Sequence, residues 1–131
     1  MTVYLDISAA AKLLIDEPES SAVAGWLDRQ VEAGEAIVSS LLLETELRRF
    51  AARERLSQVA VGEVLDGVDL VEPDRALFHE AGILPDRTLR SLDALHLATV
   101  LRLDAATLLT YDLRMTQAAA ALGIRVVAPG T

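Results

Sequence analysis

The stretch VYLDISAAAKLL at residues 3–14 decides the fold that we predict for this chain. Its first three residues, Val3–Leu5, are apolar and favour a short buried strand. Asp6 follows at once, and an alanine-rich helical stretch begins within a few residues. The same order of apolar run, polar turn and helix recurs along the chain, which is typical of an α/β domain with a mainly parallel sheet.

The expected elements give the architecture. Strands are predicted over residues 3–5, 36–39, 68–71, 107–110 and 125–128, and helices over residues 9–15, 23–31, 41–55, 59–65, 74–81, 92–103 and 113–122. Ser8 and Ser91 are the expected N-caps of the helices that follow them. Five strands with intervening helices predict a three-layer α/β/α sandwich, whose ligand site lies beyond the carboxyl ends of the strands.

Length and composition indicate one cytoplasmic domain. A chain of 131 residues without a linker or repeat suits a single domain over residues 1–131, and a hydrophobic content of 52% supports a well-filled core. No apolar run approaches the roughly 20 residues that span a bilayer, and the start of the chain lacks a signal-peptide pattern. The absence of cysteine excludes disulfides and thiolate metal sites, and we expect a reducing cytoplasm.

The net charge of −8 argues against non-specific binding of nucleic acid, which needs Lys and Arg against the phosphates. That argument is weak where some of the acids bind a metal. Arg48, Arg49, Arg53 and Arg55 cluster in one predicted helix. They could steer a phosphate, but a solvated helix face is the favoured interpretation.

Three acidic residues stand where the carboxyl edge of the sheet is expected. Asp6 and Asp112 each follow a predicted strand, and Asp93 lies in the first turn of a predicted helix. Each has a simpler explanation, because Asp caps helices and turns and because a carboxylate in a first helical turn gains about 0.3–1 kcal/mol from the helix dipole. Any one of them alone is weak support for a site.

Glu46 is different because no cap explains it. It shares one side of its predicted helix with Leu43 and Phe50, and a carboxylate beside a core stripe is costly to bury without a partner. Glu44 precedes Arg48 by four residues, the favourable order for a surface ion pair. We therefore assign Glu46 to the site and Glu44 to the surface.

Together the four acids predict a metal site made of Asp6, Glu46, Asp93 and Asp112. Converging carboxylates repel one another, and a hard cation bound through oxygen removes that strain, which favours Mg²⁺ or alternatively Mn²⁺. Zn²⁺ is disfavoured because cysteine is absent and the two histidines are far apart in the sequence. We expect Asp6 and Asp93 to be the direct ligands, whereas Glu46 and Asp112 either bind through water or position the attacking water, with one or two ions bound.

Other polar residues near these acids have open roles. His96, three residues after Asp93, could carry a proton, but a half-buried structural histidine is the favoured interpretation. Ser8 and Thr110 could orient a carboxylate or water, although capping explains the first and β propensity the second. Arg114 could meet a phosphate, hold an acid in a bidentate pair or lie on the surface by chance.

Four segments carry a family resemblance: VYLDISAAAKLL at 3–14, SSLLLETELRRFAAR at 39–53, LRSLDALHLATVLRL at 89–103 and LTYDLRMTQAAAALGIRVVAPG at 109–130. The chain resembles the PIN-domain ribonucleases, and more closely the VapC-type toxins of bacterial toxin–antitoxin pairs. The resemblance implies a metal-dependent endoribonuclease whose acidic quartet is Asp6, Glu46, Asp93 and Asp112. It also implies a homodimer and a cognate antitoxin whose tail occupies the groove of the active site.

Two other functions compete with hydrolysis of RNA. In the first, the acids are only caps, and the groove of an inactive PIN-like module receives a basic partner peptide, which the net charge of −8 also suits. In the second, the chain is a phosphoacceptor domain. That class needs a lysine beside its acidic pocket late in the chain, whereas Lys12 is the only lysine here.

Overall fold

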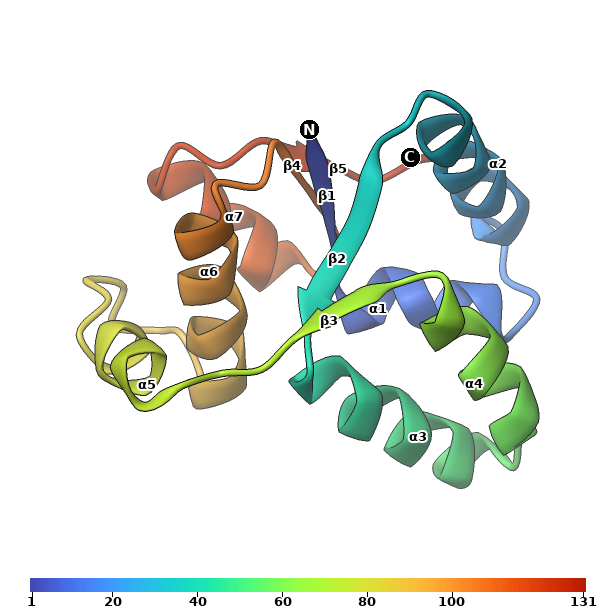
Figure 1. Ribbon diagram of the computed structural model, residues 1–131, viewed down its shortest axis with the longest axis horizontal. Coiled ribbons are helices and arrows are strands. Elements are labelled where there is room, and N and C mark those ends of the chain that lie inside the picture. The colour runs from blue at the N-terminus through green and yellow to red at the C-terminus, as the bar shows by residue number, and fades with distance from the viewer.

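The computed structural model describes residues 1–131 and contains one five-stranded sheet in which every pair of neighbouring strands is parallel. The strands are β1 (Thr2–Leu5), β2 (Ala36–Ser40), β3 (Asp69–Val71), β4 (Thr107–Leu109) and β5 (Val126–Val127). Their order in space is β3-β2-β1-β4-β5, so that β1 is the central strand (Figure 1). The predicted α/β class and parallel sheet are confirmed.

The helices fill the connections between the strands. They are α1 (Ile7–Ala10), the 3₁₀ helix η1 (Ala11–Leu13), α2 (Ser20–Glu32), α3 (Leu42–Glu54), α4 (Gln58–Asp66), α5 (Arg75–Gly82), α6 (Ser91–Leu103) and α7 (Leu113–Ala121). None of them is both long enough and apolar enough to cross a membrane.

The helices form two layers, one on each face of the sheet (Figure 1). Val3 and Leu5 point to the face covered by α1, α2, α3 and α4, whereas Tyr4 between them points to the face covered by α6 and α7. This alternation follows from the two-residue repeat of a strand. Helix α5 packs outside α6. Burial of each large apolar side chain contributes about 1.5–3 kcal/mol to folding, and the two cores together hold the sandwich.

The register of the sheet places two chain segments side by side at the carboxyl edge. Leu5 of β1 lies opposite Leu109 of β4, and the backbone N–H of Asp6 donates to the carbonyl of Leu109 at 3.1 Å. Asp6 therefore lies beside Thr110, although 104 residues separate them in the sequence.

Both predicted serine caps are wrong. Asp6, with extended φ and ψ of −87° and 155°, is the N-cap of α1 and accepts from the backbone N–H of Ser8. Ser8 lies within the helix. Ser91 is the first residue of α6, and Arg90 occupies the cap position without a side-chain hydrogen bond. An aspartate directly after a strand is already extended and can reach the N–H two residues on, so it caps before the serine can.

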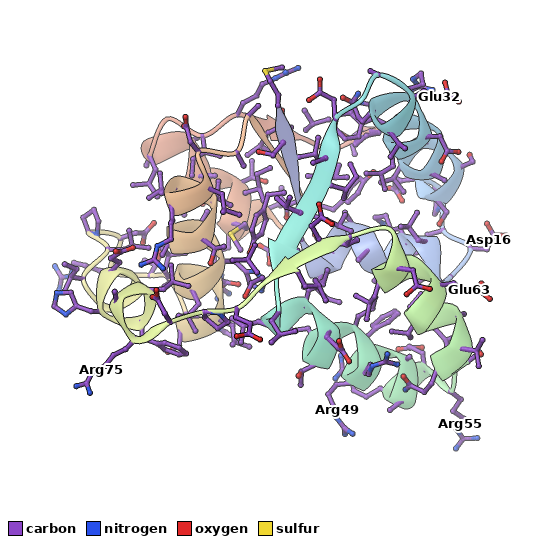
Figure 2. All side chains as sticks on the ribbon, viewed as in Figure 1. Asp16, Glu32, Arg49, Arg55, Glu63 and Arg75 are labelled. Atoms are coloured by element: carbon purple, nitrogen blue, oxygen red, sulfur yellow. The ribbon has the colours of Figure 1, made fainter.

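The arginines of α3 form a solvated face, as predicted. Arg49 and Arg55 extend away from the rest of the molecule (Figure 2). Arg48 donates through Nε to Glu44 at 3.1 Å and through Nη1 to the side chain of Gln58 at 3.1 Å, which ties α3 to α4. The assignment of Glu44 to a surface pair with Arg48 is confirmed.

Candidate active site

Three of the four predicted acids line one open cavity of about 720 Å³ at the carboxyl edge of the sheet. The residues around it are Glu46, Arg90, Ser91, Leu92, Asp93, Asp112, Leu113 and Arg114, which come from α3, from the start of α6 and from the start of α7. Asp6, the fourth acid, is not part of the lining but is near enough for its charge to act on Asp93. Three separate helices and the end of β1 therefore bring the predicted set together.

Asp6 uses one carboxylate oxygen to hold the strand ends in place. Its side chain is 3% exposed. Its Oδ2 atom accepts from the backbone N–H of Ser8 at 3.2 Å, from the hydroxyl of Ser8 at 2.6 Å and from the hydroxyl of Thr110 at 2.8 Å. Its Oδ1 atom makes no hydrogen bond to the protein. Capping and a role in the site are therefore compatible.

The hydroxyls of Ser8 and Thr110 connect β1 to the segment after β4. The oxygen of Ser8 accepts from the backbone N–H of Tyr111 at 2.8 Å, and that of Thr110 accepts from the backbone N–H of Asp112 at 3.1 Å. Both hydroxyls also donate to Asp6. Of the roles considered for these two residues, orientation of a carboxylate is the one that the structure shows.

Asp112 divides its oxygens in the same way. As the N-cap of α7, its Oδ1 atom accepts from the backbone N–H groups of Arg114 at 2.8 Å and Met115 at 3.1 Å. The Oδ2 atom has no partner in the protein. The guanidinium of Arg114 pairs with no acid, so the bidentate pair considered for it is absent.

Glu46 lies against a buried histidine. Its Oε1 atom is 2.6 Å from Nε2 of His96, and the two side chains are 18% and 1% exposed. The other imidazole nitrogen, Nδ1, is 2.7 Å from the hydroxyl of Tyr4. His96 is thus fully buried rather than half-buried, and it contacts one of the predicted acids.

Tyr4 is a residue of this site that the sequence pattern did not reveal. Its hydroxyl is buried in the core and accepts from the backbone N–H of Ser40 at 3.1 Å, in addition to its contact with His96. A signal was present, because a buried tyrosine in an otherwise aliphatic strand needs a partner for its hydroxyl. Which partner it finds depends on the packing of α6 against the sheet.

The cavity carries a concentrated negative charge. Burial raises the pKa of Asp93, and the nearby carboxylates of Asp112, Asp6 and Glu46 raise it further. Burial alone would lower the pKa of His96, but the hydrogen bond and the charge of Glu46 outweigh it and leave this pKa raised. Both shifts have one cause in common, which is an excess of negative charge in the space between these side chains.

The unused carboxylate oxygens suit a hard cation. In Asp6, Glu46 and Asp112, one carboxylate oxygen is hydrogen-bonded to the protein and the other has no partner in the protein. The side chain of Asp93 makes no hydrogen bond. Oxygen donors without thiolates are the set that Mg²⁺ and Mn²⁺ prefer. As the side chains stand, no three acidic or histidine residues are grouped closely enough to hold an ion directly. The donor chemistry therefore fits a cation that keeps part of its water shell.

Comparison with known proteins identifies the family. The family model of the PIN domain matches residues 3–121. This chain belongs to the PIN-domain family.

Two relatives match this chain over nearly the full length of both proteins. Ribonuclease VapC35 of Mycobacterium tuberculosis is 41% identical over 133 residues, covering 98% of this chain and 97% of the relative. Ribonuclease VapC46 of the same organism is 42% identical over 130 residues, covering 97% of each chain. The predicted resemblance to PIN-domain and VapC-type proteins is confirmed.

A solved structure shares the fold. VapBC2 from Rickettsia felis, crystallised with a DNA fragment from its promoter, superposes with a TM-score of 0.78 at 13% identity, over 98% of this chain and 99% of the other. At that identity the likeness concerns the fold alone, and it confirms the PIN-like sandwich.

The rim of the cavity in this PIN domain is basic and apolar. Arg90 and Arg114 are exposed, lie at the starts of two different helices, and form no ion pair within the chain. Leu92 and Leu113 beside them are exposed by 47% and 79%. Two unpaired guanidinium groups at the rim are suited to a ligand that carries phosphates.

A second cavity, of about 310 Å³, lies between α5 and α6 and is mostly apolar. Its one acid, Asp86, already accepts from the backbone N–H and the hydroxyl of Thr88. This second cavity thus offers no acid that is free to bind a cation.

Proposed function

We propose that this PIN domain is a Mg²⁺-dependent endoribonuclease and the toxin of a toxin–antitoxin pair. The observation that carries the proposal is a group of four carboxylates, of which Glu46, Asp93 and Asp112 line one cavity and Asp6 lies near enough for its charge to act on Asp93. Asp6, Glu46 and Asp112 each keep one oxygen free while the protein fixes the other. The names of the relatives, Ribonuclease VapC35 and Ribonuclease VapC46, support the same activity.

In this proposal Asp6, Glu46, Asp93 and Asp112 hold the cation, Asp6 and Asp93 directly and the other two through water. Bound there, Mg²⁺ would make an attacking water more acidic and neutralise charge on the phosphoryl oxygens. The protein supplies the orientation. Ser8 and Thr110 fix Asp6, the backbone of α7 fixes Asp112, and burial limits the motion of Asp6 and Glu46. Groups held in this way need little rearrangement when the substrate arrives.

The substrate is RNA with unpaired bases. Arg90 and Arg114 hold its backbone on either side of the acids, and the exposed leucines next to them contact bases. Sequence-specific recognition of RNA relies on unpaired bases, because side chains cannot read the deep major groove of an RNA duplex. Activity on such RNA implies a cytoplasmic protein.

The partner that inhibits the enzyme is a cognate antitoxin with a basic tail. The acidic cavity is complementary to a positively charged segment. The name of the Rickettsia felis neighbour, VapBC2, supports a partner protein. We also propose a homodimer, on the resemblance to VapC-type toxins.

The decisive experiment replaces Asp6 with Asn. Asparagine caps a helix as well as aspartate does, so the D6N variant keeps the fold, but it loses the charge that the cation needs. We expect cleavage of cellular RNA in the presence of Mg²⁺ to fall by about 10²–10³-fold, the loss typical of removing one electrostatic group from an active site. Excess EDTA should abolish cleavage by the unsubstituted protein.

The matched control is Asp16→Asn, since Asp16 points into solvent away from the cavity (Figure 2). It removes the same charge and should cleave RNA at the normal rate. Undiminished cleavage by D6N, or by the unsubstituted protein in EDTA, would refute the metal mechanism.

The inactive binding module remains the second candidate, because Asp6 and Asp112 do cap helices. A set of acids that only capped helices would bind no Mg²⁺. Calorimetric titration of the metal-free protein with Mg²⁺ separates the two, and we expect saturable binding that D6N weakens.

A further inference from the structure

A chain of hydrogen bonds runs from the sheet to Glu46 through two buried side chains. The backbone N–H of Ser40, at the end of β2, donates to the hydroxyl of Tyr4 at 3.1 Å. That hydroxyl lies 2.7 Å from Nδ1 of His96, whose Nε2 atom lies 2.6 Å from Glu46. Tyr4 is fully buried and His96 is 1% exposed, and the buried polar residues Ser39, Ser40 and Thr99 lie beside the Tyr4 hydroxyl.

The direction of each hydrogen bond follows from the number of protons available. Because the oxygen of Tyr4 already accepts from Ser40, its own proton goes to the nitrogen in short contact with it, Nδ1 of His96 at 2.7 Å. If Nδ1 carried a proton instead, the phenol proton would have to leave this 2.7 Å contact and turn to the hydroxyl of Ser39 or Thr99 beside it. The neutral imidazole therefore carries its proton on Nε2 and donates it to Oε1 of Glu46.

This series of hydrogen bonds also connects the two helical layers of the sandwich. Glu46 belongs to α3, which packs on one face of the sheet, and His96 belongs to α6, which packs on the other face. Their contact therefore joins the two helical layers beyond the end of β2. The oxygen of Glu46 that faces His96 is fixed relative to the sheet, and only the second oxygen is left for the cavity.

We propose that Tyr4 and His96 are positioning residues that hold Glu46 in the orientation in which its free oxygen serves the cation. The inference rests on the proposed function and adds two residues to it. Neither residue touches substrate. Carboxylates that take part in metal sites depend on such outer partners, whose loss typically costs about 10–100-fold in metal affinity or activity.

The test compares four substitutions in the full-length protein. His96→Leu removes the donor to Glu46, His96→Gln offers an amide N–H in its place, Tyr4→Phe removes only the hydroxyl, and His79→Leu is the matched control on the exposed surface of α5. Mg²⁺ affinity is measured by calorimetry, kcat and KM by RNA cleavage, and folding by urea titration.

We expect H96L to weaken Mg²⁺ binding by about 10–100-fold and to lower kcat with little change in KM for RNA. Y4F should weaken binding by a smaller factor, H96Q should restore most of the affinity, and H79L should match the unsubstituted protein. In the metal-free protein, ¹⁵N NMR of the neutral imidazole should report the proton on Nε2.

A merely structural role predicts lower stability in urea with unchanged Mg²⁺ affinity of the folded protein, and that result for H96L overturns the inference. If H96L does not fold, normal Mg²⁺ affinity in Y4F overturns it equally. If the unsubstituted protein binds no Mg²⁺, that result refutes both the proposed function and this inference. Equal binding by all variants refutes the positioning role alone.

Discussion

Asp6 shows at the scale of one residue how a side chain can serve both folding and a site. Its two oxygens are divided between the two tasks, with Oδ2 saturated by Ser8 and Thr110 and Oδ1 left without a protein partner. Asp112 and Glu46 follow the same division. The protein thereby orients each carboxylate through one atom and leaves the other atom available.

Thr110 is the residue on which the arrangement of Asp6 depends most. Its fully buried hydroxyl donates to Asp6 and accepts from the backbone N–H of Asp112. Thr110→Val keeps the volume but removes both hydrogen bonds, and we expect the free energy of unfolding to fall by about 1–3 kcal/mol in urea titrations.

Thr110→Ser is the matched control, because it keeps the hydroxyl and removes one methyl group, which is worth about 0.8 kcal/mol. The serine variant should be the more stable of the two. The opposite order would mean that packing, and not hydrogen bonding, is what Thr110 contributes.

At the scale of elements, α3 and α6 end in an unusual way. Arg55 and Asp104, the residues after them, adopt left-handed φ values of 56° and 49° without being glycine. In each case the following N–H reaches back into the helix, from Leu56 to the carbonyl of Ala51 and from Ala105 to that of Val100. A non-glycine residue in this conformation costs about 1–2 kcal/mol.

Arg55→Gly should therefore stabilise the protein by roughly 0.5–1 kcal/mol, since the relief of backbone strain exceeds the entropy that glycine loses. Arg49→Gly, in the middle of α3 and also exposed, should destabilise it by about 0.5–1 kcal/mol. Thermal unfolding of the two variants shows whether each substitution raises or lowers the stability of the protein. Destabilisation by R55G would show that the arginine side chain itself supports this helix end.

The sequence predicts the elements of this fold well because strand, acid and helix follow one another within a few residues. Val3–Leu5, Asp6 and the alanines after them need no distant partner to be interpreted. The caps were harder, because Asp6 and Ser8 are both good capping residues and only backbone geometry decides between them.

The candidate site was predictable as a set of acids but not as a network. Asp6 and Asp112 stand at the ends of strands, and Glu46 is marked by its place beside a core stripe. The burial of His96 and its contact with Tyr4 depend on how α6 packs against β1 and β2, which no local pattern encodes.

At the scale of the whole molecule, the distribution of charge matters more than its sum. The chain carries a net charge of −8, which repels RNA, yet Arg90 and Arg114 lie unpaired at the rim of the cavity that holds the acids. Attraction of the substrate therefore depends on few cations in the right places.

Replacing Arg90 or Arg114 with Gln should weaken RNA binding and flatten its dependence on salt. We expect the slope of log K against log salt to fall by about 0.7 for each phosphate of a single strand that the variant no longer neutralises. Binding is measured with the D6N variant, which leaves the RNA intact. Arg49→Gln and Arg75→Gln, whose side chains point into solvent elsewhere, are the controls (Figure 2). Equal slopes in all four variants would show that the rim does not touch the RNA backbone.

The central place of β1 in the sheet has a consequence for the synthesis of the protein. β1 leaves the ribosome before the other strands, but its neighbour β4 and the Thr110 hydroxyl that orients Asp6 come 104 residues later. A nascent chain that stops before β4 can pair β1 on one side only, with β2, and it lacks both Thr110 and Asp112. Translation of a damaged message would therefore yield inactive fragments. The protein would be unable to cleave RNA until almost all of its own message had been translated.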